Sequence, residues 1–271
     1  MAKRILTAVI WLPIAALGFA FAPVWAIALA ISALSVVAVY ELLWATGLVR
    51  QKRLCVISAV FAALVPLWTY YSSEFYLLLL GAFLLVSLCF LDGMLHQAKV
   101  KFEMVCAALF GALIVPCFLS SFLRIEMEME TRLIFYLPLI YPFISDAGGY
   151  FAGRLFGKHK LAPELSPKKT IEGSIGAVLF AVVGGLLFGA VAHYGFGLQP
   201  NYAVLGLLGI PLSVISQFGD LVFSYIKREF GIKDYGRIFM GHGGVLDRFD
   251  SVILTAPAVY YIMLFLIDVQ V

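Results

Sequence analysis

The sequence predicts an all-α, polytopic integral membrane protein with about nine transmembrane helices. Hydrophobic residues make up 63% of the 271 positions and charged residues only 13%, whereas soluble domains average about 45–50% apolar and about 25% charged residues. The apolar residues form continuous runs of about 20 residues, which is the length of a membrane-spanning helix. Because these runs do not alternate between apolar and polar residues, they exclude a transmembrane β-barrel.

Nine segments are long and apolar enough to be predicted as membrane-spanning helices. The first follows a short basic N-terminus and resembles a signal peptide. However, Pro23 directly follows the small residues where a signal peptide would be cleaved, and proline is unfavourable at that position. We therefore expect an uncleaved span. In chain order, the predicted spans are residues 5–23, 25–47, 54–72, 75–92, 104–123, 132–152, 173–193, 202–226 and 249–268.

The basic residues predict how these spans are oriented. With the N-terminus in the cytoplasm and the C-terminus on the opposite side, every Lys and Arg except Arg124 and Arg132 falls in a cytoplasmic segment, as the positive-inside rule describes.

The chain also divides into two regions. Residues 1–125 hold about five almost purely apolar spans, whereas residues 126–271 hold about four spans with acids and two basic loops. We therefore expect the function to reside in the second region.

An acidic residue lies inside the predicted eighth span. Asp220 interrupts an apolar run, and an Asp at the centre of a membrane helix costs about 2.5–3.5 kcal/mol to insert. It belongs to a polar stripe whose spacing of three and four residues places every member on one helical face. The stripe consists of Ser213, Gln217, Asp220, Ser224 and Lys227. Such a stripe is typical of a functional cavity, or of a polar seam that joins two helices.

A second group of charges precedes the last span. Asp247 and Asp250 are three residues apart on one helical face, with Arg248 between them. Carboxylates in this arrangement suit Mg²⁺, although neutralisation by Arg248 alone is the alternative. The preceding glycine-rich run, 241–244, can expose N–H groups to an anion or form an ordinary turn. Within it, His242 could bind phosphate, orient a substrate or carry a proton.

The sixth predicted span and the loop after it add further candidates. Asp146 lies near the end of that span, and the loop is rich in Lys. Lys168, Lys169 and Thr170 lie at the predicted N-terminus of the seventh span, where cations and free N–H groups bind phosphate well. Alternatively, the loop only follows the positive-inside bias and contacts anionic lipids. Acids for a metal, cations for phosphate and a cavity in the membrane together predict phosphoryl or nucleotidyl transfer to a lipid phosphate.

The segment from Ser224 to Asp250 resembles the signature of the phosphatidate cytidylyltransferases, also called CDP-diacylglycerol synthases. The matching residues are SYIKR at 224–228, KD at 233–234 and HGGVLDRFD at 242–250. Residues 166–173 and 216–221 look like the same family, so the resemblance covers about residues 130–260. Three positions depart from the family pattern without removing a charge, namely Ala147, Gly149 and Met240.

The resemblance implies an enzyme that converts CTP and phosphatidic acid to CDP-diacylglycerol and pyrophosphate during phospholipid biosynthesis. It also implies a dependence on Mg²⁺, a homodimer, and a location in the bacterial inner membrane with the active site facing the cytoplasm. Whether a second cation such as K⁺ binds beside Mg²⁺ is left open. The expected partners are the two substrates and membrane lipids, and nucleic acid is not expected among them.

The resemblance and the charge pattern together assign roles to individual residues. The expected metal ligands are Asp220 and Asp247, with Asp250 and Asp146 as further ligands. The expected catalytic residues are Asp220, Asp247, Lys227, His242 and Arg248. The expected substrate- and phosphate-binding residues are Lys168, Lys169, Thr170, Ser224, Arg228, Lys233, Gly243 and Gly244.

Two other functions are alternatives. A CTP-dependent polyprenol kinase would release CDP rather than pyrophosphate, and the signature around Asp247 argues against it. A secondary transporter would also carry intramembrane acids, but its broken helices would lie in symmetric halves. Here the acids cluster in one region of the chain, which favours the transferase.

Overall fold

The computed structural model describes residues 18–19, 21–72, 75–97, 99–236 and 243–269. Within these ranges the regular secondary structure is helical apart from one two-stranded antiparallel sheet. It forms two compact units. The first comprises Met1–Arg132 and Ile232–Arg248, and the second comprises Leu133–Gly231 and Phe249–Val271.

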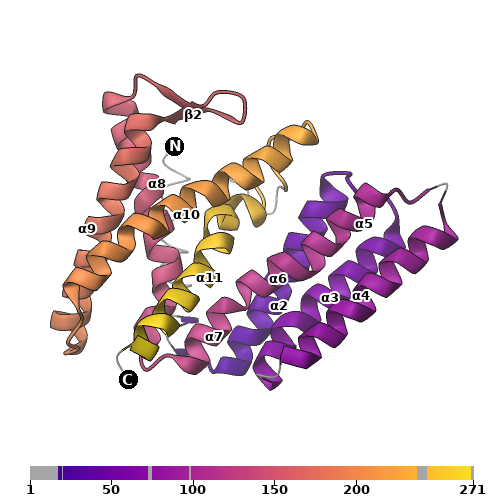
Figure 1. The fold of residues 1–271 in the computed structure, drawn as a ribbon, viewed down its shortest axis with the longest axis horizontal. Helices are drawn as coiled ribbons and strands as arrows, with labels where there is room; N and C mark the ends of the chain where they lie inside the picture. The colour runs from indigo at the N-terminus through magenta and orange to yellow at the C-terminus, as the bar shows by residue number, and fades with distance from the viewer. Residues whose placement is uncertain (1–17, 20, 73–74, 98, 237–242, 270–271) are drawn as a thin grey trace. The chain divides into compact units, whose positions relative to one another are not determined.

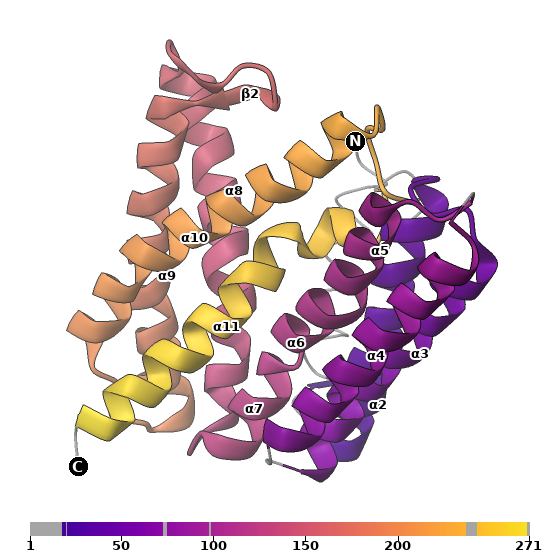
Figure 2. The same ribbon diagram turned by 45° about the vertical axis from the view of Figure 1, so that its right-hand side comes forward.

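The first unit is built from helices that pack side by side. Its elements are α2 (Val24–Tyr40), the π-helical turn η1 (Glu41–Ala45), α3 (Lys52–Tyr71), α4 (Phe75–Leu95), α5 (Phe102–Leu109), the π-helical turn η2 (Phe110–Ile114), α6 (Val115–Leu119) and α7 (Ser121–Glu128). α3 packs against both α2 and α4, as Figures 1 and 2 show. Between α2 and α3, the buried Ser32 hydroxyl donates to the Ala63 carbonyl at 2.9 Å.

One membrane span of the first unit has an irregular helix. The segments α5, η2, α6 and α7 together form a span over Phe102–Glu128. The π-helical turn η2 directly precedes the first turn of α6, which contains Pro116. Proline lacks the N–H that would bond to the carbonyl four residues earlier. The change of helical pitch at this point therefore has a local cause in the sequence.

The second unit combines four long helices with the small sheet. Its elements are the 3-10 turn η3 (Arg132–Tyr136), α8 (Leu137–Phe156), β1 (Lys160–Ala162), β2 (Ser166–Thr170), α9 (Ile171–Phe196), α10 (Tyr202–Glu229) and most of α11 (Leu246–Val269). α9 packs against both α8 and α10. The β1–β2 hairpin connects α8 to α9 and lies at one end of that helix pair in Figures 1 and 2.

Glycines allow α8 and α9 to approach each other closely. A Cβ atom added to Gly176 would lie 2.2 Å from the Ala152 Cβ, and one added to Gly173 would lie 2.9 Å from the Gly149 carbonyl oxygen. Small residues at such contacts are typical of helices that associate inside membranes. The close approach brings the end of α8 beside the start of α9.

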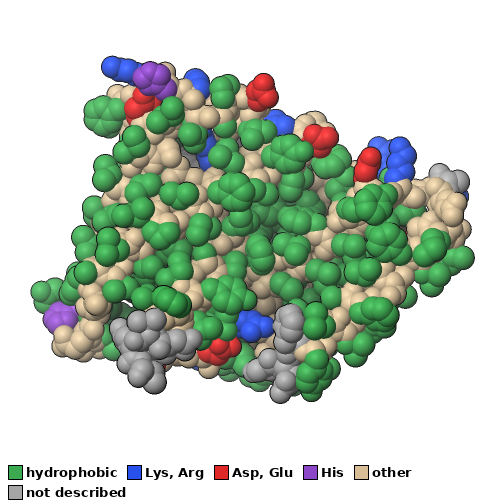
Figure 3. Space-filling model, in the orientation of Figure 1, with side chains coloured by type: hydrophobic (Ala, Val, Ile, Leu, Met, Phe, Trp, Pro, Cys, Tyr) green, Lys and Arg blue, Asp and Glu red, His purple; other side chains and the backbone are tan. Residues whose placement is uncertain are grey.

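Apolar side chains lie on the outside of the helices as well as between them. They cover most of the face that Figure 3 shows, where Lys, Arg, Asp and Glu gather mainly along the edges. On α4, for example, Leu79 is 52% and Phe83 is 67% exposed. Extended apolar surfaces of this kind are typical of proteins in contact with lipid. The protein is therefore an all-α, multi-pass membrane protein.

Seven helices in the described part of the chain are long and apolar enough to cross a membrane. They correspond to predicted spans two to five and seven to nine. The first predicted span lies almost entirely outside the described residues. The sixth, predicted at 132–152, is shifted: it becomes η3 followed by α8, which ends at Phe156 and is not among the seven. The number of spans and their orientation stay predictions.

Replacing Gly209 with alanine tests the packing of α10 against α9. The added Cβ would lie 2.5 Å from the backbone nitrogen of Val182 and 2.7 Å from the carbonyl carbon of Ala181. Because backbone atoms cannot move aside as a side chain can, we expect Gly209→Ala to destabilise the protein by about 1–3 kcal/mol. Thermal unfolding of the purified protein in detergent measures this change.

Gly195→Ala is the matched control, because nothing lies within 4 Å of a Cβ at that position of α9. Alanine is favoured over glycine in a helix by roughly 0.5–1 kcal/mol, so this variant should be at least as stable as the wild type. An unfolding temperature of Gly209→Ala that equals that of Gly195→Ala would contradict the packing described here.

Candidate functional site

A cavity of about 260 Å³ opens in the second unit. This is slightly below the range of about 300–1,000 Å³ that is usual for small-molecule sites. Its wall consists of Ser145, Asp146, Gly149 and Tyr150 from α8, Leu161, Lys168, Lys169 and Thr170 from the hairpin, Gly173, Ser174 and Ala177 from α9, and Gln217 and Asp220 from α10. Six of these residues belong to the polar or basic motifs that the sequence singles out, namely Asp146, Lys168, Lys169, Thr170, Gln217 and Asp220. The cavity therefore joins motifs that lie up to about 70 residues apart in the chain.

An ion pair between Lys169 and Asp220 lies in the wall of this cavity. The two side chains are only 22% and 26% exposed. The Ser224 hydroxyl also donates to Asp220 Oδ1 at 3.3 Å. An ionised carboxylate in apolar surroundings is costly unless it is paired and hydrogen-bonded. The ammonium group that the hairpin supplies therefore explains how α10 can carry an acid at this position.

The polar stripe of α10 serves two purposes along its length. At one end, the Ser145 and Ser213 hydroxyls hydrogen-bond at 2.7 Å, and Gln217 Nε2 donates to Ser213 at 3.2 Å. Ser174 of α9 donates to Gln217 Oε1 at 2.5 Å. This end joins α8, α9 and α10. The other end, at Asp220, faces the cavity. The stripe thus forms a polar seam among three helices and also contributes to the wall of a cavity.

Two further carboxylates lie close to Asp220. Asp146 of α8 lines the same cavity. The carboxylate of Asp250 in α11 lies near enough to Asp220 and Asp146 to be repelled by them, and near enough to Lys227 to be attracted by it. The close packing of α10 on α11 explains this, since a Cβ on Gly219 would lie 2.8 Å from the Asp250 carbonyl oxygen. The second unit therefore concentrates three acids, which need cations nearby.

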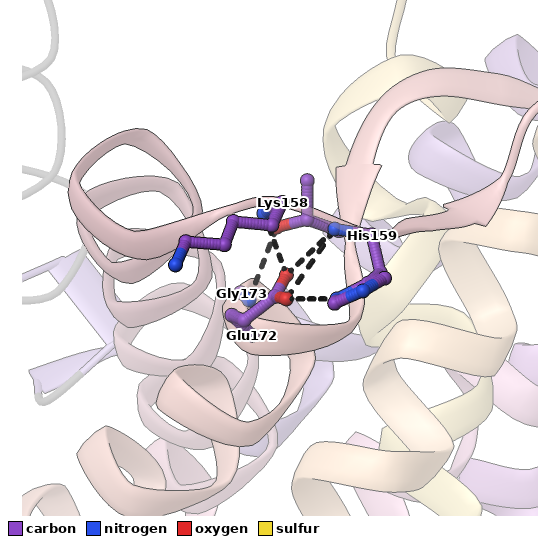
Figure 4. Close-up of polar contacts among 5 residues, drawn as sticks. Lys158, His159, Glu172 and Gly173 are labelled. Atoms are coloured by element: carbon purple, nitrogen blue, oxygen red, sulfur yellow. Dashed lines mark hydrogen bonds and ion pairs between the residues drawn. The ribbon is translucent and has the colours of Figure 1, made fainter.

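The base of the hairpin is held by a carboxylate in the first turn of α9. Glu172 accepts hydrogen bonds from the backbone N–H groups of Lys158 at 3.0 Å and His159 at 3.2 Å. The His159 ring nitrogen Nδ1 lies 2.6 Å from Glu172 Oε1. Figure 4 shows these contacts converging on the one carboxylate. Glu172 was not among the expected site residues. Its carboxylate oxygens accept the hydrogen bonds that anchor the hairpin.

Two other contacts complete the placement of the hairpin. The Thr170 hydroxyl oxygen accepts a hydrogen bond from the Gly173 N–H at 3.1 Å and so caps the N-terminus of α9. Arg228 of α10 donates to the Leu165 carbonyl at 3.2 Å. The sequence predicts phosphate-binding roles for Thr170 and Arg228. Their described contacts orient the hairpin that carries Lys168 and Lys169, and their phosphate-binding roles stay predictions.

In the first unit, Asp247 binds backbone groups of its own segment. Its Oδ2 accepts hydrogen bonds from the N–H groups of Tyr235 at 2.8 Å and Gly244 at 2.9 Å. Gly243 has a φ of 82°, which a side chain would make unfavourable. A Cβ there would also lie 2.7 Å from the Asp247 carboxylate. Asp247 therefore shapes the backbone around it, a role that the sequence did not suggest.

Glu41 is a second acid that the sequence reasoning missed. It lies in the π-helical turn η1 and is fully buried. Its carboxylate accepts hydrogen bonds from the N–H groups of Val245 and Leu246 at 3.0 Å and 2.9 Å. An acid within an apolar span is the same signal that identifies Asp220. Applied to predicted span 25–47, that rule would have found Glu41.

The other expected residues are placed as follows. Lys227 is buried, with 8% of its surface exposed, whereas Lys233 and Arg248 are exposed. His242 lies outside the described residues. Among the residues that the structure describes, no three His, Cys, Asp or Glu side chains are arranged as a complete metal cage.

Comparison with known proteins identifies the family. The model of the cytidylyltransferase family matches residues 2–266, which is nearly the whole chain. The chain belongs to this family. The match includes the α8–α10 cavity and the segment around Asp247. It therefore confirms the resemblance that the sequence motifs indicate.

Individual members of the family support the same assignment. The chain is 38% identical to the phosphatidate cytidylyltransferase of Rickettsia prowazekii over 180 residues, which cover 64% of this chain and 78% of that protein. It is 44% identical to the phosphatidate cytidylyltransferase of Bacillus subtilis over 130 residues, covering 48% and 46%. The corresponding enzyme of Staphylococcus epidermidis is 49% identical over 114 residues, covering 42% of each. The last two matches thus span about half the length of those relatives.

Replacing Glu172 with alanine tests the anchoring of the hairpin. Without the carboxylate, the N–H groups of Lys158 and His159 lose their acceptor, so the hairpin should open more often. We expect trypsin to cleave Glu172→Ala after Lys158 and Lys160 faster than it cleaves the wild type in detergent. Mass spectrometry of a cleavage time course measures both rates.

Glu164→Ala provides the control for this experiment. Glu164 is an exposed acid in the turn of the same hairpin, so its loss changes the charge of the hairpin without removing the anchor. Equal cleavage rates for the two variants would show that Glu172 does not hold the hairpin.

Proposed function

We propose that the protein is a phosphatidate cytidylyltransferase that makes CDP-diacylglycerol and pyrophosphate from CTP and phosphatidic acid. The observation that carries this proposal is the Lys169–Asp220 ion pair in the wall of a cavity among membrane helices. It combines a cation for phosphate with an acid for a metal. The family match and the names of the relatives supply the substrate class.

The lysines of the hairpin are the proposed phosphate-binding groups. Lys168 and Lys169 both line the cavity. In the structure, Asp220 is an ion-pair partner of Lys169. A triphosphate offers Lys169 a second anionic partner, and charge-assisted bonds to phosphate oxygens are among the stronger hydrogen bonds. CTP binding would thus leave Asp220 available to a metal cation.

The donor groups near Asp220 fit Mg²⁺. This ion usually takes one or two protein carboxylates and completes its coordination with water and substrate phosphates. Asp220, with Asp146 and Asp250 close to it, provides carboxylates of that kind without a complete protein cage. When bound, Mg²⁺ supplies positive charge to the triphosphate. Asp247 lies in the other unit and is proposed as a further ligand on the signature alone.

The reaction needs no covalent enzyme intermediate. A phosphate oxygen of phosphatidic acid attacks the α-phosphorus of CTP and forms the new P–O bond of the diphosphate. The bond from the α-phosphorus to the oxygen shared with the β-phosphorus breaks, and pyrophosphate leaves with that electron pair. Because the attacking oxygen is already ionised, no general base is required. The chain contributes by orienting both phosphates and by placing Lys168, Lys169 and Lys227 near the developing charge.

The setting of the enzyme follows from the same proposal. We place it in the bacterial inner membrane, with the hairpin facing the cytoplasm, because the positive-inside bias puts that basic segment there. CTP would reach the site from the cytoplasm and phosphatidic acid from the surrounding lipid. A homodimer and a second cation such as K⁺ are proposed from the family resemblance.

Product analysis tests the proposed function. The purified protein in mixed micelles with CTP, phosphatidic acid and Mg²⁺ should form CDP-diacylglycerol and pyrophosphate in equal amounts. EDTA should abolish the reaction and excess Mg²⁺ should restore it. Release of CDP together with a phosphorylated lipid alcohol would indicate a kinase instead. Turnover in micelles, which have no sealed compartment, also separates the proposal from transport.

Replacing Asp220 with asparagine tests the role of the ion pair. The change keeps the size of the side chain but removes the charge that pairs with Lys169. Loss of one preorganised electrostatic group typically lowers turnover by about 10²–10³-fold, and we expect a loss of this size. Steady-state rates of CDP-diacylglycerol formation, with Mg²⁺ at saturation, measure it.

Ser213→Ala is the matched control on the same helix face. Ser213 lies at the end of the stripe that joins α10 to α8. Its loss should lower thermal stability while leaving turnover within about a factor of 3, because it removes two neutral hydrogen bonds but no charge. Near wild-type turnover of Asp220→Asn would remove Asp220 from the proposed metal site.

A further inference from the structure

The carboxylate of Glu41 joins two segments that are about 200 residues apart in the chain. Glu41 follows directly after α2, at the start of the π-helical turn η1. Its Oε1 accepts the Val245 N–H and its Oε2 accepts the Leu246 N–H. These N–H groups lie at the start of α11, where a helix has no acceptors of its own. One side chain thus satisfies two such donors.

The surroundings of Glu41 leave little room for a different arrangement. The side chain is 0% exposed. A Cβ on Gly236 or on Gly244 would lie 2.3 Å from Glu41 Oε1. Gly236 and Gly244 therefore both lie directly against this carboxylate. Tyr235, 1% exposed, is buried next to the first of them.

The same segment carries Asp247, whose position depends on the contacts of its neighbours. Asp247 accepts the N–H groups of Tyr235 and Gly244, and Glu41 accepts those of Val245 and Leu246. Two acids thus accept hydrogen bonds from four backbone N–H groups, those of Tyr235 and of residues 244–246. The Asp247 contacts with Tyr235 and Gly244 order the backbone next to Asp247 itself. The Glu41 contacts tie Val245 and Leu246 to a membrane helix.

The form of the helix at Glu41 supports a specific role. η1 interrupts the regular α-helical pitch at this residue. Single π-helical turns occur frequently at functional sites, because they redirect side chains that a regular helix would point elsewhere. An acid within a transmembrane helix is likewise rare and is retained for a function. Packing alone would favour an apolar residue at such a buried position.

We propose that Glu41 is a positioning residue that holds the segment around Asp247 in place for the transfer reaction. The proposal rests on the proposed cytidylyltransferase function. It gives the N-terminal helices a part in catalysis beyond anchoring the protein in the membrane. Glu41 acts through the backbone of Val245 and Leu246 and does not itself contact substrate.

Replacing Glu41 with glutamine tests the proposal. Glutamine has nearly the same size but only one acceptor oxygen, and its amide nitrogen would face the N–H group that loses its partner. We expect hydrogen exchange at Val245 and Leu246 to accelerate by about tenfold or more, the factor expected when a hydrogen bond to a charged group is lost. We also expect the KM for CTP to rise by a similar factor. Mass spectrometry of deuterium uptake in detergent and steady-state kinetics measure the two effects.

Glu126→Gln is the matched control in the same unit. Glu126 is also a buried carboxylate, with 3% of its side chain exposed, and its partner is Arg132 at 2.6 Å rather than the Asp247 segment. The same chemical change there should leave the exchange of residues 243–247 and the KM for CTP at their wild-type values. A general loss of folded protein would lower kcat in both variants without raising the KM.

The outcomes separate this proposal from the proposed function. Wild-type exchange at Val245 and Leu246 in Glu41→Gln, or faster exchange with an unchanged KM, would overturn the positioning role. Absence of CDP-diacylglycerol formation by the wild type would instead overturn the proposed function, and the exchange data would still test whether Glu41 holds the segment. If Glu41→Gln does not fold, Glu41→Asp replaces it with the same expectations, because its shorter side chain keeps the charge but withdraws both oxygens.

Discussion

Carboxylates among apolar helices need ion-pair or hydrogen-bond partners, and the placement of two segments of this protein depends on those partners. Burying an unpaired charge costs far more than a typical protein can tolerate. Asp220 is paired with the ammonium group of Lys169 from the β1–β2 hairpin. Glu41 is paired with two backbone N–H groups at the start of α11. In both cases an acid on a membrane helix contacts a segment that follows a different helix, so the contact that satisfies the acid also places that segment.

The residues that the sequence could identify are those whose signal is local. Asp220 stands out against an apolar run, and its stripe is legible because helical spacing alone puts Ser213 and Ser224 on the same face. Lys168 and Lys169 are recognisable by their charge beside a helix start. Seven of the predicted spans also correspond to long apolar helices in the described residues, since length and hydrophobicity decide them without knowledge of the tertiary fold.

The features that the sequence could not provide depend on tertiary contacts. The path of the hairpin decides which backbone N–H groups face Glu172. The positive φ of Gly243 helps to decide which ones face Asp247. The spacing of residues in the sequence reveals neither. The β1–β2 pairing is short, and its exposed side chains do not alternate regularly with buried ones, so it lacks the alternating pattern that marks a strand. The backbone contacts of Thr170 and Arg228 are of the same kind, because residue type alone does not show them.

The division of the chain has a consequence for how the protein can be cut into parts. Residues 232–248 belong to the same unit as the N-terminal helices, and the second unit is interrupted by them. A fragment that begins at residue 133 would contain Val245 and Leu246 but would lack the helix that supplies their acceptor. The helices before residue 133 would in turn keep a buried carboxylate with no donors from this segment. Neither fragment is self-sufficient, so gene fusions, truncations and split-protein designs that treat residue 132 as a domain border would separate two halves of one structural unit.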